Sequence, residues 1–386
     1  MAKQTIIDWQ GDGLLVAVGH SQGATVHLEK LCAQTMGPQL GADELSSEVS
    51  ASQALSRAVD ELGLRKSDVT VVVPREMVEV RTLSIPRVDP NELPDIIRFQ
   101  AQRQLASMGD QWTLDYVLLP QEAGQETLTA LVAAISPVAL AGIEAACTAA
   151  GVQVTHMAFR PIEIARYAIH SGKLPSSGAA VVVCLAERHA DLLILHNGQV
   201  VQIRGTKLPA DGVQLPAILG GELRRSLMAA SSQLGSLPIA GALLFASPEL
   251  AQQAEAVLRE AVGCAVTSVD PASLLPTKFG QAATLSQSSA NRIAAVAGAC
   301  HFASADPKTR LDFKEPKKRP PPKSKRPTYL LAAAAAALLL LAGISWWVSA
   351  NRALDEALAL QKTEIANKQD LKKVSEERIA ELREIE

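Results

Sequence analysis

Two stretches of this sequence decide the fold: TIIDWQGDGLLVAVGHSQGATVHLEKL at residues 5–31 and AAVVVCLAERHADLLILHNGQVVQIR at residues 179–204. Each reads as three short β-rich runs in close succession, joined by turns such as Gly11-Asp12-Gly13 and the hairpin dipeptide Asn197-Gly198. A helical pattern follows in each half. The sequence therefore predicts an α/β chain with two lobes, each opening on three consecutive strands.

The rest of residues 1–305 alternates short β-rich runs with helical ones. Further strands are expected at 69–73, 128–135, 152–157 and 241–245. Helices are expected at 47–62, 91–106, 137–150, 160–171, 213–234, 248–262 and 286–301.

Charge is distributed unevenly along the chain. Residues 1–307 carry 21 Lys and Arg against 29 Asp and Glu, whereas the remainder carries 16 against 11. An acidic first part is a poor partner for nucleic acid, because DNA affinity comes largely from neutralised phosphates. The five cysteines form no CxxC pair, which indicates a reducing compartment. The seven histidines form no HxxxH or HExxH pair, so we expect no metal site.

One apolar stretch is long enough to cross a membrane. YLLAAAAAALLLLAGISWWV, from Tyr329 to Val348, contains no charge over about 20 residues, the length that spans a bilayer's hydrocarbon layer. Tyr329 opens it, and Trp346 and Trp347 close it, as interfacial anchors do. We expect one transmembrane helix over residues 328–350.

The flanks of this stretch predict its orientation. Lys314–Pro327 holds seven basic residues and one acid, which places the large N-terminal part in the cytoplasm and the basic run beside anionic lipid. Its prolines make it an extended spacer. The N-terminus lacks the plan of a signal peptide.

The segment after the membrane stretch is charge-rich. Residues 351–386 read as a periplasmic helix, either a coiled coil that could pair two copies of the chain or an amphipathic helix leaning on a partner. Because no capping signal precedes the last residue, we also expect a further domain beyond it.

Several motifs resemble the type IV pilus assembly actin-like family (PilM). They resemble the related cytoplasmic domain of the type II secretion L protein almost as well. They are IDWQ at 7–10, VRTLSIP at 80–86, LDYVLL at 114–119, AAIS at 133–136, AGV at 150–152, HNGQVVQIR at 196–204, ELRRSL at 222–227 and VDP at 269–271. The resemblance implies an actin-like (RNase H-like) two-lobed ATPase fold, with lobes at 1–172 and 173–305.

The tail resembles a second pilus protein, PilN, in which a short cytosolic peptide precedes one transmembrane helix. RLDFKEPKK at 310–318, within the linker 306–327, stands where PilN-like proteins carry their partner-binding peptide. We expect Leu311 and Phe313 to insert into an apolar groove of the cytosolic lobe, with Asp312 and Lys314 at its rim. The alternative is a linker with two incidental hydrophobic residues.

Nucleotide chemistry in the actin-like fold requires two phosphate-binding hairpins. The first survives in part as Asp8, Gly11, Asp12 and Gly13. The second reads Cys184-Leu185-Ala186, and the adenosine motif, normally Gly-Gly, reads Ala246-Ser247. Cysteine is not a Mg²⁺ ligand, and the Cβ of Ala186 would obstruct a phosphate. We therefore expect no catalytic residue and no cofactor, with Mg·ATP kept as the alternative.

The resemblance implies a non-catalytic inner-membrane scaffold of a type IV pilus or type II secretion-like platform. Its partners would be other inner-membrane platform proteins, a secretion ATPase and lipid. The alternatives are an active actin-like ATPase of the same machinery and a bitopic division or signalling adaptor.

Overall fold

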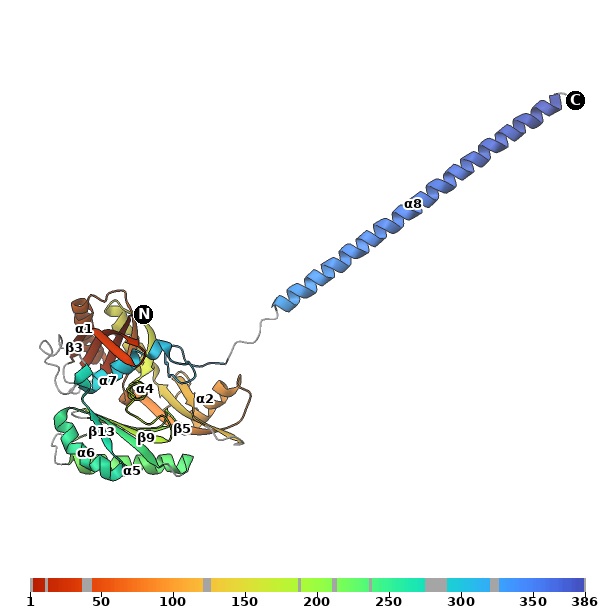
Figure 1. Cartoon of the computed structure of the whole chain (residues 1–386). Helices are drawn as coiled ribbons and strands as arrows, with labels where there is room; N and C mark the ends of the chain where they lie inside the picture. Colours follow the sequence, from red (N-terminus) through yellow and green to blue (C-terminus); the bar gives the residue numbers. More distant parts are fainter. Residues whose placement is uncertain are drawn as a thin grey trace. The chain divides into compact units, whose positions relative to one another are not determined.

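The computed structural model describes residues 3–10, 13–36, 44–120, 126–186, 189–209, 214–235, 238–274, 290–319 and 326–384. The chain divides into two compact units, Met1–Arg319 and Pro320–Glu386. The first unit holds the sheets, and the second is built on one long helix (Figure 1).

The first sheet underlies what we call lobe I. Its strands are β1 (Gln4–Gln10), β2 (Gly13–Gln22), β3 (Thr25–Thr35), β4 (Asp68–Val73) and β8 (Gln153–Phe159), in the order β3-β2-β1-β4-β8. The three consecutive strands pair antiparallel, and β1, β4 and β8 pair parallel. Helix α1 (Glu44–Leu62) contacts β2, β3 and α3 (Pro137–Ala149). Because β8 lies at the edge, one side of its backbone is open to a further strand.

The second sheet underlies lobe II and repeats the same plan. Strands β9 (Ala179–Leu185), β10 (His189–His196), β11 (Gln199–Lys207), β12 (Ile239–Phe245) and β13 (Val266–Val269) lie in the order β11-β10-β9-β12-β13. Asn197 and Gly198 both have positive φ, as the tight turn between β10 and β11 requires. Helices α5 (Leu215–Leu234) and α6 (Pro248–Val262) pack together beside this sheet.

A third sheet forms a subdomain that the sequence pattern does not separate from lobe I. Strands β5 (Val78–Pro86), β6 (Thr113–Leu118) and β7 (Thr127–Ile135) lie in the order β5-β7-β6, and helix α2 (Leu93–Gln104) packs on them. This subdomain has its own apolar core, which includes Leu83, Ile97 and Val132. It follows the short helix η1 (Arg75–Met77).

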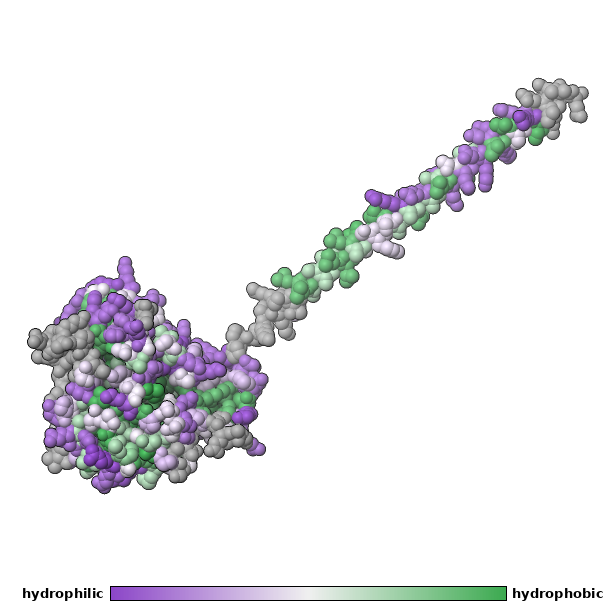
Figure 2. Space-filling model, viewed as in Figure 1, coloured by the Kyte–Doolittle hydropathy of each residue, from purple (hydrophilic) through white to green (hydrophobic). Residues whose placement is uncertain are grey.

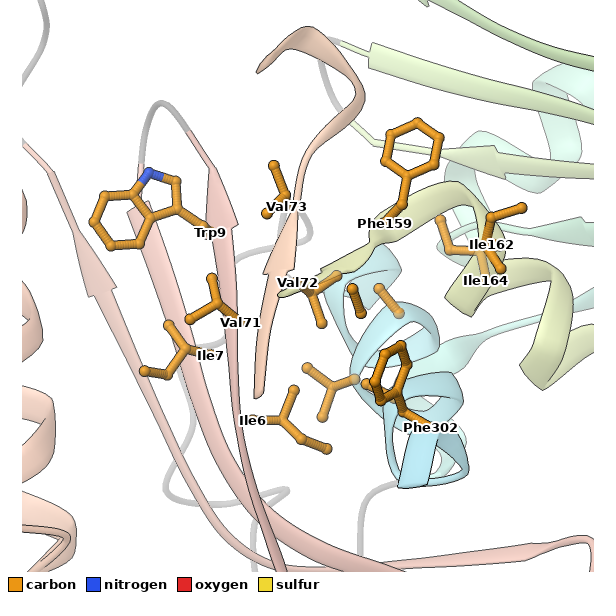
Figure 3. Packing of buried hydrophobic residues seen from close by; sticks show 14 of the residues in the cluster. Ile6, Ile7, Trp9, Val71, Val72, Val73, Phe159, Ile162, Ile164 and Phe302 are labelled. Atoms are coloured by element: carbon orange, nitrogen blue, oxygen red, sulfur yellow. The ribbon is translucent and has the colours of Figure 1, made fainter. Parts of the chain in front are cut away.

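Two helices join the lobes. Nine residues of α4 (Arg160–His170) are buried, and α4 contacts strands of both five-stranded sheets. Helix α7 (Ala290–Ala299) packs on α4, β1 and β4, although it lies in the sequence range expected for lobe II. Figure 3 shows Ile6 and Val72 facing α7, with Ile162, Ile164 and Phe302 beyond it. The short helices η2 (Pro271–Leu274) and η4 (Phe302–Ser304) flank α7 in sequence.

The second unit contains α8 (Arg326–Glu384), a continuous helix of 59 residues. It is long and apolar enough to cross a membrane, with a mean hydropathy of 2.1 over its most apolar window. Figure 2 shows hydrophobic residues along its first part and hydrophilic ones along most of the remainder. The transmembrane stretch and the charge-rich segment, which the sequence analysis treats separately, are thus one helix.

Candidate functional site

After η4 the chain runs along lobe I. There the segment Arg310–Lys317, which we call the docked segment, binds beside β8. Asp312 forms an antiparallel bridge with Ala158 of β8, and the Phe313 N–H donates to the Met157 carbonyl at 2.9 Å. The docked segment therefore adds one short strand contact to the open edge of the first sheet. Strand addition of this kind is a common mode of peptide binding.

Leu311 and Phe313 anchor the docked segment through their apolar side chains. They are 0% and 1% exposed, respectively. The Phe313 ring meets the Phe159 ring edge-on at a centroid distance of 6.2 Å. Both residues belong to the main hydrophobic cluster of the first unit, so this segment forms part of the core.

Asp312 lies inside the groove, and the expectation that placed it at the rim is wrong. The residue is 1% exposed. Oδ1 accepts the N–H groups of Met157 and Lys314, both at 3.0 Å, and Oδ2 lies 2.7 Å from Nδ1 of His156. Burial of a carboxylate is tolerated here because several donors surround it. Lys314 does lie at the rim, where it pairs with Glu144 at 2.5 Å.

Asp115 of β6 holds the docked segment at two points. Its buried carboxylate accepts the N–H of Asp312 at 2.8 Å and the N–H of Lys317 at 3.1 Å. The Lys317 Nζ lies 3.2 Å from both carboxylate oxygens and donates to the Arg310 carbonyl at 2.7 Å. Burial raises the pKa of Asp115 and lowers that of Lys317, while each charge opposes the shift of the other.

Asp115 lies within the LDYVLL motif, but the sequence does not predict its place in this site. The only signal is a carboxylate between apolar residues of a motif, where an unpaired charge would be costly.

Cation–π contacts also hold the docked segment in its groove. Arg310 lies over the Phe302 ring at 5.1 Å, and Lys317 lies over the Tyr116 ring at 5.5 Å.

His156, Asp312 and Glu315 form a group that could hold a metal ion, with ligand atoms within 4.8 Å of one another. Glu315 is exposed, whereas both oxygens of Asp312 already accept hydrogen bonds or pair with His156. The group is therefore better explained as the polar lining of the groove.

The first expected phosphate hairpin lies between β1 and β2. Asp8 is fully buried in the second half of β1, and its Oδ1 lies 3.8 Å from Nε of Arg160. Gly11 and Asp12 lie outside the described residues. At Gly13 a Cβ would come within 2.6 Å of the Gln34 carbonyl oxygen, so strand packing against β3 already requires glycine there.

The second hairpin, between β9 and β10, closes on itself. The Ala186 N–H donates to the His189 carbonyl at 2.8 Å, and Glu187 and Arg188 lie outside the described residues. Cys184 is buried, and burial raises the pKa of its thiol strongly. A neutral thiol is a poor ligand for Mg²⁺, which prefers oxygen.

At the expected adenosine motif, each group has a structural role. The Ala246 N–H donates to the Val269 carbonyl at 3.2 Å. The Ser247 side chain caps α6 by accepting the Leu250 N–H. The described residues of these three elements do not fit Mg·ATP.

The expected membrane anchors Tyr329, Trp346 and Trp347 lie on α8, and all three side chains are exposed.

Two five-stranded sheets with the same strand order, joined by buried helices, define an actin-like α/β fold. A solved structure of the PilM-PilN type IV pilus biogenesis complex is similar, with a TM-score of 0.63 and 16% sequence identity over 79% of this chain and 99% of that chain. At this identity the likeness shows the fold.

Two further structures align less closely. A Bacteroides thetaiotaomicron protein with an actin-like ATPase fold and unknown function has a TM-score of 0.44 and 9% identity over 72% of this chain and 94% of that one. The cytoplasmic domain of EpsL, an inner-membrane component of the type II secretion system of Vibrio cholerae, has a TM-score of 0.39 and 12% identity over 63% and 82%. No family model matches the sequence, and no curated protein does.

Proposed function

We propose that this protein is an inner-membrane component of an assembly platform of the type IV pilus or type II secretion kind, in which the actin-like unit binds partners without hydrolysing ATP. The fold is that of the PilM-PilN complex structure. The chain adds a helix long and apolar enough to span a membrane. A protein that binds on one side of a membrane and reaches across it suits such a platform.

The docked segment is the observation that carries this proposal. In the PilM-like systems that the sequence resembles, the binding peptide belongs to a separate membrane protein. Here the peptide and its groove belong to one chain, with Leu311 and Phe313 buried. Only five residues separate η4 from Arg310. This short tether keeps the docked segment near the groove at a high effective concentration. The chain then leads directly to α8.

The non-catalytic role is supported by how the nucleotide elements are used. Asp8 pairs with Arg160, Ala186 closes its own hairpin and Ser247 caps a helix. Among the described residues, these three groups therefore contact the protein itself and not a phosphate or Mg²⁺.

The arrangement in the envelope follows from the charge pattern. The unit Met1–Arg319 is cytosolic, the basic residues between the docked segment and Pro327 lie at anionic lipid, and residues 351–386 lie in the periplasm. Exposed apolar residues on the last part of α8, such as Leu358, Ile365 and Leu371, provide a surface for a platform protein or a second copy. A secretion ATPase would be met on the cytosolic side.

Gene replacement in the source organism tests the platform role. Deletion should abolish pilus assembly or protein export, and Leu311→Ala with Phe313→Ala should do the same while the chain stays in the membrane. Glu315→Ala, at an exposed position of the same segment, is the matched control and should behave as the parent. Normal assembly and export in the deletion strain would refute the proposal.

The non-catalytic part has a separate test. The purified full chain should release no phosphate from Mg·ATP above the buffer rate. Phosphate release that Asp8→Ala abolishes would show an active ATPase and leave the platform role standing.

A further inference from the structure

Charged residues of both lobes gather where the two hairpins meet, and we call them the interlobe charge cluster. Lobe I supplies Asp8, Arg75, Glu76 and Arg160, and lobe II supplies His189 and Asp191. Of these residues, only Asp8 is expected from the sequence at a nucleotide site. The rest come from segments far apart in the chain.

Arg160 is the centre of this cluster. It is the first residue of α4 and only 3% exposed. Its Nε lies 3.8 Å from Asp8 Oδ1, and among the described residues Nε and Nη2 have no hydrogen-bond partner. The cost of burying this guanidinium is therefore offset mainly by attraction to nearby carboxylates and not by hydrogen bonds. Burial lowers the pKa of Arg160, but the surrounding acidic groups, with Asp8 and Asp191 first among them, raise it, and the net pKa is raised.

Asp191 brings the carboxylate of lobe II. It lies on β10 opposite Cys184 of β9, on the hairpin that corresponds to the second phosphate site. Burial raises the pKa of Asp191 to about 6, and the charge of Arg160 opposes this rise more than any other group does. Arg75 also opposes it, whereas Glu76 and Asp8 add to it.

Direct approaches confirm that the two lobes touch at this point. A Cβ on Gly205 of β11 would lie 3.1 Å from Arg75 Cγ and 3.7 Å from Asp191 Oδ1. Nε2 of His189 lies 4.0 Å from Oε1 of Glu76 at the exposed side of the cluster. Arg75 and Glu76 of η1 in lobe I thus lie against β10 and β11 of lobe II.

We propose that Arg160 is a built-in cation of the interlobe site: its buried guanidinium pairs with Asp8 of lobe I, is attracted by Asp191 across the contact with lobe II, and holds the lobes closed without a bound nucleotide. In an actin-like ATPase, acids on the two hairpins would converge on a cation and phosphates. Here a side chain supplies the positive charge. The acids are therefore neutralised without Mg²⁺, and the guanidinium repels a second cation. The inference does not depend on the platform role.

A plainer reading is that Arg160 and Asp8 only stabilise lobe I, since both belong to it. The two readings differ in what happens between the lobes. Helix α4 offers a matched control, because Arg166 pairs with Glu163 at 2.9 Å and both are buried within the same helix. Loss of that pair should weaken the fold without opening the lobes.

The test measures the distance between the lobes in the full chain in nanodiscs. Spin labels on Cys264 of lobe II and on Gln53→Cys of α1 report it, since the other four cysteines are buried. Arg160→Met should lengthen or broaden this distance and lower Tm by roughly 5–10 °C. Arg160→Lys should restore much of the closure. Arg166→Met should lower Tm with the distance unchanged.

Two further variants test the proposal if Arg160→Met does not fold. Asp191→Asn should broaden the distance with little unfolding, because it removes only the lobe II charge. Adding Asp8→Asn to Arg160→Met should recover part of the lost Tm, since the buried negative charge that Arg160 balances is then removed as well. Unchanged distances in both Arg160→Met and Asp191→Asn, or equal opening in Arg166→Met, would overturn the proposal.

Discussion

The carboxylate of Asp115 accepts the backbone N–H of Asp312 at 2.8 Å, a contact between residues 197 positions apart. One acid of β6 thereby binds the backbone of the segment that leads to the membrane helix. The same carboxylate pairs with Lys317, so a single side chain holds the docked segment at two points.

Replacing Asp115 should release the docked segment. Asp115→Ala leaves Lys317 half-buried without its counter-ion, so we expect a loss of about 3–5 kcal/mol in unfolding free energy and faster tryptic cleavage at Lys317. Adding Lys317→Met should recover part of the loss, whereas Glu92→Ala, an exposed acid beside α2, should have no effect. Full protection from trypsin in Asp115→Ala would contradict this account.

The apolar anchors should matter more than the charge at the rim. Leu311→Ala and Phe313→Ala each remove a fully buried side chain, so each should cost about 2–5 kcal/mol and expose the chain near Arg310 to proteolysis. Glu315→Ala serves as the control. If Tm and cleavage of both variants match the parent within error, the segment is only a linker.

His301 should make stability sensitive to pH. Its burial, the stacked His170 at 4.1 Å and Arg166 lower the pKa of His301 from 6.5 to about 4. The unfolded chain therefore binds this proton more readily than the folded one, so the contribution is present above pH 6.5 and lost as pH falls from 6.5 to 4. The Tm of the parent should fall more steeply over this range than that of His301→Gln. His27→Gln, at an exposed position, should keep the parent's slope, and identical slopes in all three would rule out this role for His301.

Mg·ATP should add little stability. A ligand at a hundred times its Kd stabilises by about 2.7 kcal/mol, roughly 5 °C in Tm for a unit of this size. Because Asp8 is paired with Arg160 and Cys184 is buried, we expect no clear shift with millimolar Mg·ATP. A shift of several degrees that Asp8→Ala abolishes would show that the hairpins bind nucleotide.

Topology can be tested with fusions. A reporter that is active only outside the cytoplasm should work when attached after Glu386 and fail at the N-terminus, because the basic run precedes the apolar stretch. The opposite pattern would reverse the orientation proposed here.

Local patterns in the sequence were enough to predict the elements that depend on near neighbours. The three-strand openings appear as β1–β3 and β9–β11, and the Asn197-Gly198 turn has the expected positive φ. The chargeless run from Tyr329 lies in one helix. Alternation, turn chemistry and apolar length act over a few residues, so they can be read directly. The periplasmic coiled coil stays a prediction.

Long-range relationships were beyond the reach of these patterns. The third sheet pairs β5 with β7 across an intervening helix and strand, and no strand is predicted from the sequence at either β5 or β6. Asp312 was expected at the rim because an acid in a linker is usually solvated, but His156 and the Met157 N–H bury it.

The sequence by itself therefore determined the two-lobed α/β plan and the apolar helix, because both depend on periodicity within short segments. Only the tertiary structure decided that Asp115 grips the docked segment and that Arg160 faces Asp8. Each of these contacts joins side chains from distant segments. A buried charge is stable only beside its partner, and that partner is chosen by the packing of the sheets and helices around it.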